Sequence, residues 1–162
     1  MIPFMKKLFL SIIVLFLLTS CSEDIKFNNP SLQGLKDNVF WRVVDSKATL
    51  ASDGSLQIEG YTSNEKLFLK TTSTAPQTYF LGTSESKKAS YELLGSGGSI
   101  IFSTGFGIGD GQIVITEYDA VNMTVSGTFK FNAENIANNP LAGPSINFQQ
   151  GVFYKVPVVS VQ

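Results

Sequence analysis

The stretch VNMTVSGTFKFN, residues 121–132, decides the fold class of this chain. Apolar residues and one glycine occupy every second position: Val121, Met123, Val125, Gly127, Phe129 and Phe131. Polar residues occupy the positions between them: Asn122, Thr124, Ser126, Thr128, Lys130 and Asn132. This alternation with a period of two predicts a β-strand with one face in the core and the other in water. Gly127, in the middle of the stretch, indicates a bulge or a close approach of another backbone.

The chain from Val39 onward consists of short strand-like segments separated by turn residues. Residues 91–94 and 100–103 are expected to pair across the glycine-rich turn at 95–98. Residues 133–139 are expected to form one helical turn. Pro157 is expected to place the last strand at a sheet edge or to end it, because proline has no N–H to donate.

These segments predict an all-β fold with about nine short strands. No stretch behind the first 20 residues has a sustained apolar period of 3.6, which a helix would need. We expect an antiparallel β-sandwich. A closed lipocalin-like β-barrel is the alternative, because the period of a strand does not show whether the sheet edges meet.

The first 20 residues have the parts of an export signal. Lys6 and Lys7 are followed by an apolar run over residues 8–18 that only Ser11 interrupts. A run of this length suits the centre of a signal peptide and is too short for a membrane-spanning helix.

The run ends in Leu18-Thr19-Ser20-Cys21, which resembles the lipobox of bacterial lipoproteins. We expect cleavage after Ser20 and lipidation of Cys21, the only cysteine of the chain. An ordinary secreted protein with one free thiol is the alternative. Each buried CH₂ contributes ~0.8 kcal/mol to membrane binding, and two or more acyl chains anchor a protein stably. Cys21 is therefore expected to hold the protein on a membrane.

The residues after Cys21 indicate which of the two bacterial membranes the protein is expected to reach. Ser22 stands where an aspartate often means retention at the inner membrane, so the outer membrane is favoured. Glu23 and Asp24 fit either a signal for export to the cell surface or a solvated tether.

Three segments follow from this pattern: a signal peptide over residues 1–20, a lipid-anchored and partly docked tether over 21–38, and a single β-domain over 39–162. The signal peptide contains two of the 12 Lys and Arg residues and none of the 13 Asp and Glu residues, so the mature net charge is −3. This charge argues against nucleic acid as a partner, which requires a basic stripe.

The composition also limits the chemistry. There is no histidine, and Cys21 is expected to carry lipid. Ser-His-Asp and Cys-His catalysis and the usual zinc, copper and haem ligands are therefore excluded. We expect no catalytic residues, no metal and no cofactor.

Two local patterns have weak chemical interpretations. The glycine-rich stretch 105–111 superficially resembles a dinucleotide-binding loop, but a strand rather than a helix is expected after it. Asp110, Glu117 and Asp119 bracket one strand-like segment. Because Asp110 and Asp119 lie at its opposite ends, we do not expect them to converge on a calcium ion.

Aromatic side chains with a polar tip could form a sugar-stacking surface, and the candidates are Trp41, Tyr61, Tyr79, Tyr91, Tyr118 and Tyr154. The favoured interpretation is that they cover sheet faces and strand ends.

Four blocks carry a resemblance to a known family: FNNPSLQGLKDNVFWR at 27–42, GDGQIVITEYD at 109–119, VSGTFKFNAEN at 125–135 and NFQQGVFYKVPV at 147–158. Together they resemble a family of small Bacteroidota lipoproteins whose domain has no assigned function. The resemblance implies a location in the cell envelope and a single β-rich domain, and it implies that part of 27–38 belongs to the fold.

The sequence favours a non-enzymatic β-domain, anchored in the outer membrane through lipid on Cys21, that binds or scaffolds a glycan, a peptide or another envelope protein. The alternatives are an enzyme that acts on envelope or extracellular glycans through carboxylates, and a structural or assembly role in the envelope.

Overall fold

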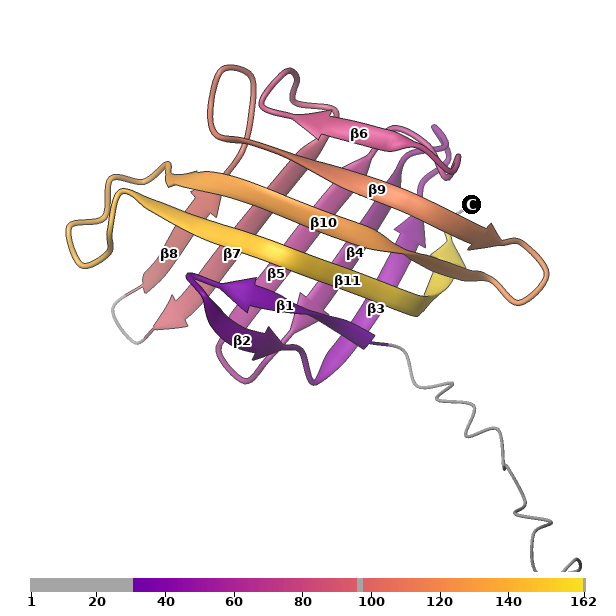
Figure 1. Ribbon diagram of the computed structural model, residues 1–162, viewed down its shortest axis with the longest axis horizontal. Coiled ribbons are helices and arrows are strands. Elements are labelled where there is room, and N and C mark those ends of the chain that lie inside the picture. Colours follow the sequence, from indigo (N-terminus) through magenta and orange to yellow (C-terminus); the bar gives the residue numbers. More distant parts are fainter. Residues whose placement is uncertain (1–30, 96–97, 162) are drawn as a thin grey trace, which may run out of the picture.

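The computed structural model describes residues 31–95 and 98–161, which form eleven strands and no helix (Figure 1). No helix that could cross a membrane is therefore found in these two ranges. The strands are β1 (Ser31–Lys36), β2 (Val39–Arg42), β3 (Asp45–Leu50), β4 (Leu56–Tyr61), β5 (Glu65–Thr71), β6 (Thr78–Leu81), β7 (Lys88–Gly95), β8 (Gly98–Ser103), β9 (Asp110–Asp119), β10 (Thr124–Asn135) and β11 (Ser145–Ser160). The predicted all-β class is confirmed, with more strands than expected.

All strands belong to one sheet in the order β2-β1-β11-β3-β4-β5-β7-β8-β10-β9-β6, with a further pairing between β10 and β11. Figure 1 shows two layers: β1, β2, β6, β9, β10 and β11 in front, and β3, β4, β5, β7 and β8 behind. The end of β10 pairs with β8, and the end of β11 pairs with β3, so backbone hydrogen bonds join the layers on both sides. The expected sandwich of separate sheets is thus one continuous sheet. The β11–β3 pairing is parallel, and the other strand pairings are antiparallel.

Strand β10 confirms the predicted alternation from Gly127 to Asn132 and extends it to Asn135, whereas Ser126, predicted to face water, is buried. Buried and exposed residues alternate from Gly127 to Asn135, and Ala133 pairs with Ile146 of β11. The helical turn predicted at 133–139 is therefore wrong, because cross-strand pairing continues the strand to Asn135 and residues 136–139 form no helix. Val121 instead lies in the turn before β10 and is 92% exposed.

Gly127 provides both features that the sequence indicated. The pairing register of β10 shifts at this residue against both β9 and β11. A Cβ atom here would overlap the carbonyl oxygen of Val114 and the ring of Phe153. Gly127 therefore allows β9 and a core aromatic ring to approach the β10 backbone.

The prediction that Pro157 lies at an edge or ends a strand is wrong, because β11 is an interior strand that continues to Ser160. On one side β11 pairs with β10. On the other it pairs with β1 up to Tyr154 and with β3 from Val158. Val158 donates its N–H to Met123 on the β10 side, and successive N–H groups of a strand alternate in direction. Pro157 therefore faces the gap between β1 and β3, where no donor is needed.

Strand β1 lies in the segment expected to be a partly docked tether. Leu32 is completely buried and packs over Gly60 of β4, where any side chain would overlap it. β1 pairs with β11 and with β2. The described fold thus begins at Ser31, before the boundary placed at residue 39.

Phe148 of β11 lies at the centre of the aromatic core. Its ring centroid is 4.9 Å from Phe131, 5.3 Å from Trp41, 5.7 Å from Tyr91 and 6.2 Å from Phe129. Burial of such a side chain contributes about 1.5–3 kcal/mol before entropy costs. The polar tips of Trp41 and Tyr91 extend from this core to the Glu65 carboxylate.

Candidate functional site

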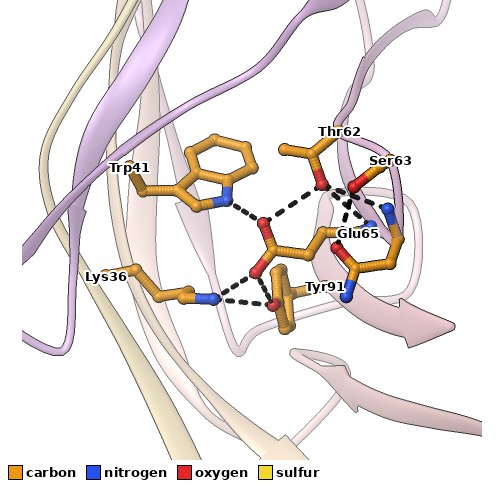
Figure 2. Close-up of polar contacts among 7 residues, drawn as sticks. Lys36, Trp41, Thr62, Ser63, Glu65 and Tyr91 are labelled. Carbon is orange, nitrogen blue, oxygen red and sulfur yellow. Dashed lines mark hydrogen bonds and ion pairs between the residues drawn. The ribbon is translucent and has the colours of Figure 1, made fainter. Parts of the chain in front are cut away.

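A part-buried polar cluster centred on Glu65 lies between the two layers (Figure 2). Trp41 Nε1 donates a hydrogen bond of 2.6 Å to Glu65 Oε2, and Thr62 Oγ1 donates one of 3.3 Å to the same oxygen. Lys36 Nζ and the Tyr91 hydroxyl both donate to Oε1. Lys36 Nζ also donates to the Tyr91 hydroxyl over 2.8 Å and lies 4.8 Å from the centre of its ring.

The strand positions of these residues explain why they meet. Glu65 is two residues before Leu67, so it shares the inward face of β5. Lys36 shares the inward face of β1 with Leu32. Asp37 and Asn38 have φ angles of 48° and 64° and form the tight turn that returns the chain as β2. This turn brings Trp41 alongside β1 on the same face.

The environment fixes the charge state of the cluster at neutral pH. Burial opposes ionisation of Glu65, whose side chain is 14% exposed. The hydrogen bonds from Lys36, Tyr91 and Trp41 outweigh burial and hold the pKa of the Glu65 carboxyl below its usual value. Burial and the hydrogen bond to Glu65 raise the pKa of Tyr91. Glu65 is therefore an anion and Tyr91 a neutral phenol near pH 7.

The cluster acts chemically as a cross-link between strands. Four donors from the protein itself fill the acceptor positions of the Glu65 carboxylate. These donors come from β1, β2, β7 and the turn before β5. A saturated carboxylate of this kind joins the hairpin of β1 and β2 to the back layer.

Sequence reasoning singled out Trp41 and Tyr91 but missed Glu65 and Lys36. The signal that could have found Glu65 is a charged residue on the apolar face of the segment Leu67-Phe68-Leu69. A charge in that position requires partners when it is buried.

The acidic residues considered for calcium do not converge. Asp110 and Asp119 occupy the two ends of β9, as expected. Asp110 accepts a hydrogen bond of 2.9 Å from Asn132, and Asp119 accepts bonds from the backbone of Val121 and Asn122. Within residues 31–95 and 98–161, no group of three or more acidic, histidine or cysteine side chains could hold a metal ion.

The aromatic residues considered for sugar stacking are separated in the fold. Trp41, Tyr79 and Tyr91 are buried, and the Tyr79 hydroxyl donates to the backbone around Ser73. Tyr61 lies beside the Lys47–Glu59–Lys66 ion pairs, Tyr118 lies at the end of β9, and Tyr154 lies beneath Lys155. No single platform contains them.

Residues 105–109 of the glycine-rich stretch form a loop, and residues 110–111 already belong to β9, the strand expected after it. Gly105 and Ile108 form an isolated bridge, and the Phe106 N–H donates to Glu85 over 2.8 Å. Backbone N–H groups of this loop thus donate hydrogen bonds to the segment 82–85. The motif Leu18-Thr19-Ser20-Cys21 lies outside the described residues.

A family model matches residues 28–157, from just before β1 to near the end of β11. The chain belongs to the family described as Domain of unknown function (DUF6252). The resemblance to a family without an assigned function is thereby confirmed, and the match includes β1 in the DUF6252 domain. No curated protein and no solved structure matches the chain.

Proposed function

We propose that this protein is an outer-membrane lipoprotein whose DUF6252 domain binds or scaffolds a partner without catalysing a reaction. The observation that carries the proposal is the motif Leu18-Thr19-Ser20-Cys21 behind Lys6, Lys7 and an apolar run. This order of charge, apolar run and cysteine is that of a lipoprotein signal.

The position of the domain supports the anchor. The first core strand starts at Ser31, ten residues after Cys21. At ~3.3 Å per residue, a chain of this length reaches at most about 33 Å. The domain would therefore stay close to the membrane and still clear the lipid headgroups.

The Glu65 cluster supports the absence of catalysis at this carboxylate. Glu65 is saturated by Lys36, Trp41, Thr62 and Tyr91, so its carboxylate is already used in joining strands. A general acid or base must instead reach a proton of the substrate.

The experiment is a comparison of the full-length protein with Cys21→Ser in cells. Mass spectrometry of the wild type is expected to show cleavage before Cys21 and an acylated cysteine, with the protein in the outer-membrane fraction. Cys21→Ser is expected to lose acylation and to leave the membrane. Acylation or membrane retention that persists in Cys21→Ser refutes the anchor.

A further inference from the structure

The outward face of the front layer carries one continuous row of side chains across six strands. Directly paired residues of antiparallel strands point to the same side of a sheet. Leu35 of β1 pairs with Phe40 of β2 and with Gln149 of β11. On the other side of the layer, Gln112 of β9 pairs with Lys130 of β10 and Phe80 of β6. In full, the row is Phe40, Leu35, Gln149, Gln150, Lys130, Gln112 and Phe80.

A bulge in β11 joins the two halves of this row. Phe148 and Gly151 are buried, and both Gln149 and Gln150 between them point outward. Gln150 has a φ of 51°, and the register of β10 against β11 shifts opposite it, at Lys130. The bulge thus places two amide side chains where a regular strand would place one.

The same bulge creates a hollow. A cavity of about 130 Å³ is lined by Gln33, Gly34, Leu35, Phe40 and Gln150. A Cβ on Gly34 would come within 3.1 Å of Gly151 Cα, so the two backbones are in close contact at this point. The exposed ring of Phe40, which is 65% accessible, borders the hollow.

The amide groups of this face are available to a ligand. Within the described part of the chain, the side chains of Gln33, Gln112, Gln149 and Gln150 have no hydrogen-bond partner. The neighbouring row differs, because there Asn147 donates to Asn132 over 2.5 Å and Asn132 donates to Asp110 over 2.9 Å. One row is therefore linked internally, and the row beside it is open.

We propose that this face, defined by Gln33, Leu35, Phe40, Phe80, Gln112, Lys130, Gln149 and Gln150, binds an extended neutral glycan. Each glutamine amide both donates and accepts, as a sugar hydroxyl does. The exposed rings of Phe40 and Phe80 supply apolar surface for the C–H faces of sugar rings. This inference rests on the proposed binding function and names its ligand.

The shape and charge of the face favour this ligand over a protein. The row spans six strands, or about 24 Å at ~4.8 Å between neighbours, which suits an extended chain. Phe40 and Leu35 form an apolar pair at one end of the row, and Phe80 lies alone at the other end, beyond the amides and Lys130. The row therefore lacks the large contiguous apolar patch typical of protein interfaces. The charges around it balance, since Lys130 and Arg42 are matched by Asp110 and Glu134. Figure 1 shows no described element in front of this layer.

The test is isothermal titration calorimetry of the full-length protein in detergent micelles. The probes are cellohexaose, xylohexaose, mannohexaose and maltohexaose, with hexagalacturonate as the acidic control. Phe40→Ala is compared with Phe106→Ala, which removes a similarly exposed ring, 75% against 65%, from the loop before β9. Gln33→Ala and Gln112→Ala are compared with Gln57→Ala on the back layer. Circular dichroism establishes that each variant is folded.

At least one neutral hexasaccharide is expected to bind. Phe40→Ala is expected to weaken binding about tenfold, and each glutamine variant about threefold or more. Phe106→Ala and Gln57→Ala are expected to bind as the wild type does. The proposal is overturned if no neutral probe binds at millimolar concentration, if only hexagalacturonate binds, or if Phe40→Ala leaves affinity unchanged.

The two proposals fail separately. Mass spectrometry of the titrated sample is expected to find intact hexasaccharide. Shortened products would overturn the non-enzymatic function, whereas glycan binding by this face would still stand. If the folded and acylated protein binds no neutral probe, only the proposal that this face binds a neutral glycan is overturned.

Discussion

Trp41 Nε1 donates a hydrogen bond of 2.6 Å to Glu65 Oε2 and thereby joins an edge strand of the front layer, β2, to β5 of the back layer. The other carboxylate oxygen receives Lys36 from β1 and Tyr91 from β7. One side chain of β5 thus connects this strand to the hairpin of β1 and β2 and to β7. For β2 this connection adds to the pairing with β1, which is its only strand partner within the described residues.

Replacement of Glu65 by glutamine is expected to destabilise the domain. Glu65→Gln keeps the size of the side chain but removes its charge. It also turns one oxygen into an NH₂ group, which cannot accept the hydrogen bonds that the neighbouring side chains donate to Glu65. Loss of charge-assisted bonds in a part-buried site is expected to lower the free energy of unfolding by about 2–3 kcal/mol. Urea denaturation measures the change. Glu117→Gln, at an exposed position of β9, is the control and is expected to change it by less than about 0.5 kcal/mol. Equal effects of the two substitutions would mean that the cluster does not stabilise the fold.

The contribution of Glu65 is expected to disappear in acid. Because the folded state lowers the pKa of Glu65 below 4.5, its stabilisation is complete above that pH and is lost as the pH falls through the folded pKa. The difference in unfolding free energy between wild type and Glu65→Gln is therefore expected to shrink as the pH falls below 4.5 towards the folded pKa. Denaturant titrations at several pH values measure it. A difference that stays constant over this range would show that the charge of Glu65 is not what stabilises the fold.

Gly127→Ala is expected to disrupt the fold more than Gly54→Ala does. At Gly127 a methyl group would overlap the backbone oxygen of Val114, which cannot move without breaking the pairing of β9 with β10. The expected loss is about 3 kcal/mol or more. Gly54 has a φ of 82° but nothing within 4 Å of a Cβ, so its substitution costs only about 1–2 kcal/mol of backbone strain. Thermal unfolding followed by circular dichroism distinguishes the two. Comparable melting temperatures would contradict the close approach at Gly127.

Several elements could be predicted because their patterns are local. β7 and β8 pair across the glycine-rich turn as expected. The alternation around Val125 and Phe129 predicted an amphipathic strand, and a glycine in its interior indicated a bulge. Each of these signals lies within one short stretch, where period and turn chemistry apply directly.

Strand β1 and the Glu65 cluster could not be predicted in this way. In SLQGLK the two leucines, Leu32 and Leu35, fall on opposite faces of a strand, so no alternation is present. The segment is a strand because β11 and β2 pair with it on either side. Lys36 and Trp41 lie 29 and 24 residues from Glu65, and no motif links residues at such separations.

The sequence by itself determined the all-β class and the one cysteine with a predicted modification, Cys21, because strand period and signal motifs are read along the chain. Only the tertiary structure decided that β11 is an interior strand, that the two layers are one sheet, and that free glutamines and two phenylalanines share an outward face. The physical reason is that these features depend on which strands pair and in what register. Pairing is fixed by burial summed over the whole core, and not by any one segment.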